Sequence, residues 1–106
     1  MKRLLAEMRK TVGNELLRAQ TGFGVHYHSP HEGYGVLTEE LFEANHEVER
    51  LTVTAQMLLH DLHDNDEKGM SDCLDIIEEY ATHAACEYVQ VAAVARKMRE
   101  SLEVKA

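Results

Sequence analysis

Apolar side chains recur every three or four positions along three segments of the chain, and this spacing places them on one face of an α-helix. In the first segment, residues 2–20, the apolar face consists of Leu5, Met8, Val12, Leu16 and Ala19. Gly13 and Asn14 interrupt this segment, and a glycine inside a helix costs about 1 kcal/mol relative to alanine. The pattern therefore predicts a helix over residues 2–20 with a weak point in its middle, where it can kink or break.

A second helix is predicted to begin at residue 30, because the residues around this position form a capping box. The Ser29 hydroxyl can accept a hydrogen bond from the backbone N–H of Glu32, and the Glu32 side chain can reach back to the Ser29 N–H. Pro30 occupies the first helical position, where its missing N–H has no consequence. Residues 21–29 then form a connection, in which the alternating Phe23, Val25 and Tyr27 indicate a short extended stretch lying on the helices.

The second and third helices are predicted to be long and antiparallel. Over residues 30–64 the apolar positions alternate spacings of four and three, at Leu37, Leu41, Ala44, Val48, Leu51, Ala55, Leu58 and Leu62. After a polar turn, residues 70–103 show the same alternation at Leu74, Ile77, Ala81, Ala84, Tyr88, Val91, Ala95, Met98 and Leu102. Two sustained stripes joined by a short turn predict an antiparallel helical hairpin. Together with the first helix they give an all-α fold.

The length of these helices indicates an oligomer. A helix of thirty-odd residues extends about 50 Å, whereas a compact domain of this size has a diameter of about 35 Å. Further apolar residues lie outside the stripes, at Phe42, Val53, Leu59, Ile76, Val89 and Val94. We therefore expect a homodimer or homotetramer whose chains complete a four-helix bundle. The alternative is a break near residues 50–54, where three β-branched residues follow one another, giving four shorter helices and a compact monomer.

Length and composition limit the number of domains, the kind of partner and the location that the chain can have. The 106 residues suit a single domain, residues 1–106. Lys and Arg number 11 against 19 Asp and Glu, and the net charge of −8 argues against a partner of duplex nucleic acid. No run of about 20 apolar residues is present for a membrane span. The N-terminal residues become charged before a signal-peptide core can form, so a cytoplasmic location is expected.

Acidic residues gather beside the apolar stripe at one height of the predicted hairpin. Glu40, Glu43 and Glu47 lie on one face of the second helix, and Glu87 lies on the third, where an antiparallel register places it opposite residue 47. Buried carboxylates that cluster need protons or a cation, and oxygen ligands select Mg²⁺ or Mn²⁺. The sequence therefore indicates a metal site, although charge patterning by itself favours a solvated acidic face.

Two stretches resemble a known family. Residues 31–48, with the motif Glu39-Glu40-x-x-Glu43, resemble the first motif helix of the MazG-like, all-α nucleoside triphosphate pyrophosphohydrolase superfamily. Residues 87–97 resemble a later helix of the short MazG-like proteins that phages and prophages encode. In outline the resemblance covers residues 30–103.

This resemblance implies hydrolysis of a nucleoside triphosphate to the monophosphate and pyrophosphate, with Mg²⁺ or Mn²⁺ as cofactor, in a homodimer or homotetramer. By position, Glu40 and Glu43 are the expected catalytic pair, and the expected metal ligands are Glu39, Glu40, Glu43 and Glu87. Gln90 stands where the family has an aspartate, and its neutral amide offers one carbonyl oxygen without charge. Glu47, His83 and Gln90 are therefore expected to support the site.

The connection and the start of the second helix supply the expected nucleotide-binding residues. Phe23 and Tyr27 offer aromatic faces, and His28 and His31 stand near a helix N-terminus, which attracts phosphate. A second hypothesis belongs to a different class. In this reading the chain is a catalytically inactive helical module that binds a protein partner or a nucleotide without turnover, and Gln90 is the residue that favours it.

Overall fold

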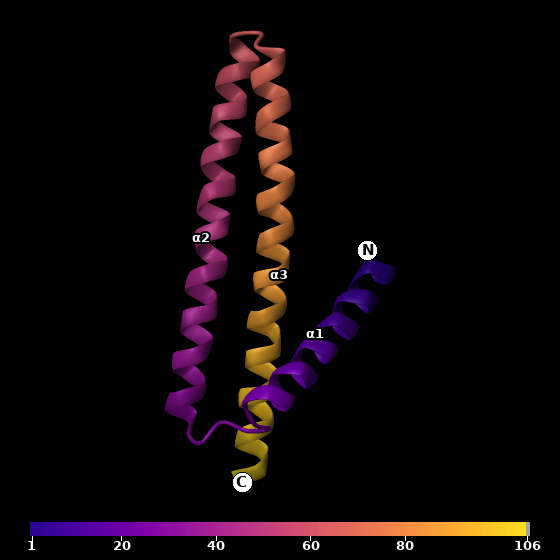
Figure 1. Cartoon of the computed structure of the whole chain (residues 1–106), viewed down its shortest axis with the longest axis vertical. Helices are drawn as coiled ribbons and strands as arrows, with labels where there is room; N and C mark the ends of the chain where they lie inside the picture. Colours follow the sequence, from indigo (N-terminus) through magenta and orange to yellow (C-terminus); the bar gives the residue numbers. More distant parts are fainter. Residues whose placement is uncertain (106) are drawn as a thin grey trace.

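The computed structural model describes residues 1–105, which form three α-helices and no strand. These are α1 (Lys2–Phe23), α2 (Pro30–His63) and α3 (Glu67–Lys105). The helices α2 and α3 lie side by side and run in opposite directions, while α1 crosses the C-terminal half of α3 at an angle (Figure 1). The all-α class predicted from the sequence is confirmed.

The starts and ends of the helices follow local hydrogen bonds. The Ser29 hydroxyl accepts a hydrogen bond from the Glu32 N–H at 3.1 Å, as the capping box predicts. At the other end of α2 the chain turns at Asn65, which has a φ of 54°, and the Asp66 carboxylate accepts from the Gly69 N–H at 2.9 Å. The helix α1 continues to Phe23, three residues beyond the predicted end, and α3 begins at Glu67, three residues before the predicted start.

Both predicted weak points are helical. The helix α1 continues through Gly13, and α2 continues from Pro30 to His63 without a break at residues 50–54. In that stretch the hydroxyls of Thr52 and Thr54 donate to the carbonyls of Val48 and Arg50, four residues earlier. Such bonds let β-branched threonine satisfy its hydroxyl within the helix. The alternative of four shorter helices is therefore wrong.

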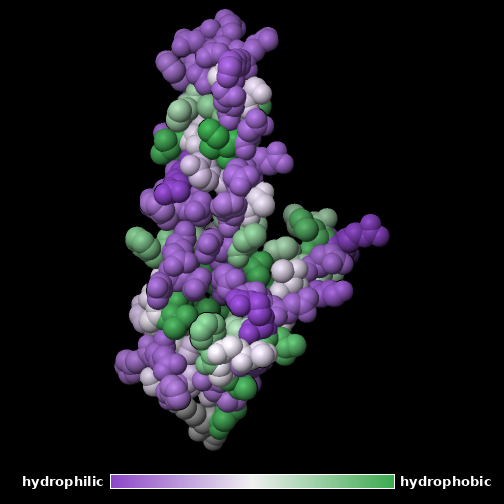
Figure 2. Space-filling view, viewed as in Figure 1, coloured by the Kyte–Doolittle hydropathy of each residue, from purple (hydrophilic) through white to green (hydrophobic). Residues whose placement is uncertain are grey.

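The core of the single chain is small. The buried apolar residues are Leu16, Tyr27, Ala44, Cys73, Ala84, Val89 and Ala93. Many larger apolar side chains, among them Phe42 on α2 and Leu17 on α1, are exposed, and Figure 2 shows hydrophobic patches along both the hairpin and α1. The radius of gyration is 18.0 Å, whereas a compact domain of this length has about 13 Å.

The connection between α1 and α2 differs in part from the expectation. Tyr27 is buried, but Phe23 and Val25 are 81% and 55% exposed, and residues 24–29 form no strand. The chain leaves α1 at Gly24, whose φ of 94° favours glycine. Within residues 1–105, no helix combines the length and the apolar character that crossing a bilayer requires.

Candidate metal and nucleotide site

Three carboxylates from two helices converge. Glu40 and Glu43, one turn apart on α2, and Glu87 on α3 each present an oxygen within 4.8 Å of the others. Glu40 and Glu87 are half-buried, and Glu43 is exposed. The structure thus brings together three of the four metal ligands proposed from the sequence. It groups Glu87 with residues 40 and 43, whereas the simple antiparallel register placed it opposite residue 47.

Electrostatic repulsion accompanies this convergence. Burial raises the pKa of the Glu40 carboxyl above its ordinary value, and the charges of Glu43 and Glu87 raise this pKa further. Glu39 and Glu15 contribute smaller effects of the same sign. Like charges that share a site disfavour one another's ionisation. The cluster therefore gains stability from protons or from a cation.

The other predicted ligands and supporting residues lie outside the cluster. Glu39 is exposed, and its charge raises the pKa of the nearby Glu40 carboxyl. Glu47 is half-buried, and among the described residues its Oε2 atom is buried without a hydrogen-bond partner. His83 is exposed, and its Nε2 lies 3.0 Å from the Glu79 carboxylate on the same helix. His83 is therefore occupied elsewhere.

Gln90 interacts with a residue of α1 that the sequence did not single out. Its side-chain nitrogen donates a hydrogen bond to Glu15 Oε1 at 2.8 Å. The Arg18 Nε also donates to the Glu15 carboxylate, at 3.1 Å to Oε2. The hydrogen bond from Arg18 is the main cause that lowers the pKa of Glu15, with a further contribution from Gln90 and an opposing one from burial. Glu15 thus stays ionised and holds the amide of Gln90 toward α1.

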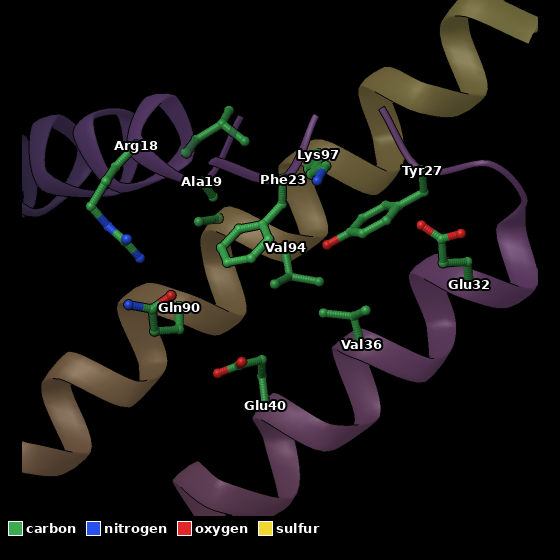
Figure 3. A pocket seen from close by; sticks show the side chains of 12 residues that line it. Arg18, Ala19, Phe23, Tyr27, Glu32, Val36, Glu40, Gln90, Val94 and Lys97 are labelled. Atoms are coloured by element: carbon green, nitrogen blue, oxygen red, sulfur yellow. The ribbon is translucent and has the colours of Figure 1, made fainter. Parts of the chain in front are cut away.

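A pocket of about 370 Å³ opens beside the cluster, where α1 crosses the hairpin. All three helices and the connection contribute to its wall, which consists of Leu16, Arg18, Ala19, Phe23, Tyr27, Glu32, Val36, Glu40, Gln90, Ala93, Val94 and Lys97. In Figure 3, Phe23 lies beside Val94, and the hydroxyl of Tyr27 points into the same space. Glu40 belongs both to this wall and to the acidic cluster.

Two of the four predicted nucleotide-binding residues line this pocket. They are Phe23 and Tyr27, whereas His28 and His31 are exposed and lie outside the lining. The buried backbone N–H of Tyr27 donates to the Ser101 hydroxyl at 2.9 Å, which ties the connection to α3. Burial raises the pKa of the Tyr27 phenol, and the charges of Glu32 and Glu40 add to this effect. The phenol therefore remains protonated and can donate a hydrogen bond.

Residues of α1 and of the end of α3 were missed by the sequence reasoning. Glu15, Arg18 and Lys97 carry ordinary helix-surface signals in the sequence. Only the crossing of α1 over α3 brings Arg18 and Lys97 to one pocket and Glu15 to Gln90 in its wall. No family model, no curated protein and no solved structure matches this chain.

Proposed function

We propose that this chain is a nucleoside triphosphate pyrophosphohydrolase that depends on Mg²⁺ or Mn²⁺. The observation that carries the proposal is the convergence of Glu40, Glu43 and Glu87 within 4.8 Å at the edge of a 370 Å³ pocket with aromatic walls. Small-molecule sites are typically apolar pockets of about this size with a few convergent polar groups. The resemblance of residues 31–48 and 87–97 to the MazG-like superfamily supports the same activity.

The residues of the cluster fit a divalent cation. All three donors are carboxylate oxygens, which Mg²⁺ and Mn²⁺ prefer, and their mutual repulsion is the kind that a cation relieves. Glu40, Glu43 and Glu87 would hold the ion, with the charge of Glu39 beside them. When bound, such an ion polarises a phosphate and lowers the pKa of water.

The chain's own residues bind and orient the nucleotide. Phe23 and Tyr27 offer aromatic surfaces to the base, and Arg18 brings a cation to the pocket wall. Water attacks the α-phosphorus and releases its proton to the solvent, the bond to the bridging oxygen breaks, and pyrophosphate leaves with the bonding electrons. In this arrangement the base lies in the pocket and the triphosphate extends toward Glu40, the one residue shared by pocket and cluster.

A second candidate function rests on Gln90. Its neutral amide replaces a charged ligand, and its nitrogen is committed to Glu15. Loss of an anionic ligand weakens a Mg²⁺ site, so the chain would then bind a nucleotide or a protein partner without turnover.

We further propose that the working form is a cytoplasmic homodimer or homotetramer in which chains complete a helical bundle. The single chain exposes 7768 Å², whereas a compact monomer of 12.0 kDa exposes about 6,000 Å². Exposed apolar residues occur on all three helices, for example Leu17, Phe42 and Ile76. Sedimentation equilibrium of the full chain tests this state, and a monomer at all concentrations would contradict it.

The activity is tested by incubating the protein with ribo- and deoxyribonucleoside triphosphates, separately with Mg²⁺ and Mn²⁺, and separating the products by chromatography. Monophosphate and pyrophosphate are the expected products, and Glu43→Gln is expected to abolish them. The matched control is Glu49→Gln, which changes an exposed carboxylate of the same helix that lies outside the cluster. A folded oligomer that turns over no nucleotide would favour the inactive module.

A further inference from the structure

Lys97 is a largely buried lysine in the wall of the pocket. The residue is 5% exposed, and its Nζ lies 4.3 Å from the centre of the Tyr27 ring. Within residues 1–104 its ammonium forms neither a hydrogen bond nor an ion pair. A cation over an aromatic face is attracted to the ring, but the ring leaves its N–H donors unused. Water in the pocket reaches the Nζ atom, which keeps some exposed surface although the residue as a whole is buried. A bound molecule that displaces this water has to supply an acceptor, because a donor that is shielded from water and unpaired is costly.

Lys97 lines the pocket, so a bound molecule can supply the missing acceptor. The surroundings of the ammonium select the kind of acceptor. Val36, Ala93 and Val94 give the wall an apolar character, and the charges of Glu32 and Glu40 reach the neighbouring Tyr27 phenol. Beside Lys97, away from the cation proposed at Glu40, a phosphate with two negative charges would be repelled by Glu32, which lies outside the acidic cluster. A neutral carbonyl oxygen on a flat ring satisfies the ammonium without this repulsion.

The position of Lys97 along α3 also favours a carbonyl oxygen over a phosphate as its acceptor. Lys97 lies ten residues after Glu87, which corresponds to about 15 Å along the helix axis. If the phosphates of a nucleotide lie at the carboxylate cluster, the base rather than a phosphate reaches the end of the pocket where Lys97 and Tyr27 lie.

We propose that Lys97 determines base specificity by donating a hydrogen bond to a ring carbonyl oxygen of the nucleobase. This inference rests on the proposed binding of nucleotides. Uracil, thymine, cytosine and guanine carry such an oxygen, and adenine does not. The pocket therefore favours the carbonyl-bearing bases over adenine, because adenine offers the ammonium only ring nitrogens in place of a carbonyl oxygen.

The test measures binding without metal, so that it does not depend on catalysis. The full chain in EDTA is titrated with UMP and, separately, with AMP by isothermal calorimetry. A hydrogen bond from the charged Lys97 ammonium to the uracil carbonyl is expected to make the affinity for UMP about tenfold or more higher than the affinity for AMP. Equal affinities, or no detectable binding of either nucleotide, would overturn the inference. This comparison needs no variant, so it stands even if substitutions at residue 97 disturb folding.

The variant Lys97→Met keeps the length of the side chain and removes its donors. It is expected to reduce the UMP-to-AMP affinity ratio to about one while the circular dichroism stays unchanged. Lys68→Met is the control, because Lys68 is exposed near the start of α3 and pairs there with Asp72. A preference for UMP that persists in Lys97→Met would refute the role of this residue.

Titration with inorganic pyrophosphate distinguishes a base contact from a phosphate contact. In the presence of Mg²⁺ the affinity for pyrophosphate is expected to be the same in the unmodified chain and in Lys97→Met, and a loss in the variant would assign Lys97 to phosphate instead. The hydrolysis assay is separate from these measurements. Failure of turnover with an intact UMP preference would reject only the enzyme, whereas turnover with no discrimination against adenine would reject only the role of Lys97.

Discussion

Gly33 and Gly35 lie two positions apart on α2, and replacing each by alanine separates helix propensity from packing. At Gly35 an added Cβ would meet nothing within 4 Å. Gly35→Ala is therefore expected to raise the free energy of unfolding by about 0.5–1 kcal/mol, because alanine loses less backbone entropy on folding and favours the helix.

At Gly33 the same methyl group meets packed side chains. Its Cβ would lie 2.9 Å from Met98 Cγ, 3.2 Å from Met98 Sδ and 3.2 Å from Tyr27 Cδ2. Inserting a methyl group into a packed site typically costs about 1–3 kcal/mol. Subtracting a propensity gain of about 1 kcal/mol leaves Gly33→Ala destabilising by about 0–2 kcal/mol. The contact between α2 and α3 at this point thus requires glycine.

Urea denaturation followed by circular dichroism measures both variants, at one protein concentration because an oligomer's stability depends on it. Gly33→Ala is expected to be less stable than Gly35→Ala by about 1–3 kcal/mol. In a Met98→Ala background the closest atom and one of the two atoms at 3.2 Å are gone, and Gly33→Ala is expected to lose most of its cost. If Gly33→Ala stabilises as much as Gly35→Ala, the close packing of α2 on α3 described above is wrong.

Two further predictions concern the buried hydrogen bond and the acidic cluster. Ser101→Ala leaves the buried Tyr27 N–H without an acceptor and is expected to lower the free energy of unfolding in urea by about 1–3 kcal/mol. The control is Thr82→Ala, which removes an exposed hydroxyl that donates to Glu78 within the same helix. It is expected to change the free energy of unfolding by less than about 0.5 kcal/mol. Because the pKa of Glu40 is raised in the folded chain, its charge destabilises the fold at neutral pH, and this penalty disappears as the pH falls below the ordinary carboxyl value of about 4.3. Glu40→Gln is therefore expected to stabilise the metal-free protein at pH 7 more than Glu39→Gln does, with no difference at low pH, and a destabilised Glu40→Gln at pH 7 would contradict the repulsion.

The helices could be predicted from the sequence because the interactions that form them are local. The cap at Ser29 joins residues three positions apart, and the apolar stripes of α2 and α3 reflect the period of the helix itself. The hydroxyls of Thr52 and Thr54 find acceptors four residues away, so even β-branched residues did not interrupt α2. The ends were less certain, since the last turn of a helix depends on what packs against it.

The acidic residues at the site were visible in the sequence because Glu40 and Glu43 lie one helical turn apart. Their grouping with Glu87 followed in outline from the antiparallel direction of the third helix, but the register estimate alone favoured Glu47 as its neighbour. The pairing of His83 with Glu79 and the burial of a Glu47 oxygen without a partner among the described residues arise in the folded chain, and periodicity does not describe them.

The pocket, by contrast, was decided by tertiary structure alone. Gln90 meets Glu15 across 75 positions of sequence, and Lys97 meets the ring of Tyr27 across the whole hairpin. The first contact depends on the crossing of α1 over α3, and the second on the connection that follows α1. Leu16 on α1, Tyr27 in the connection and Ala93 on α3 are all buried and line the same pocket. Hydrophobic periodicity shows which face of a helix is buried, but it carries no information on which helix covers that face or at what angle.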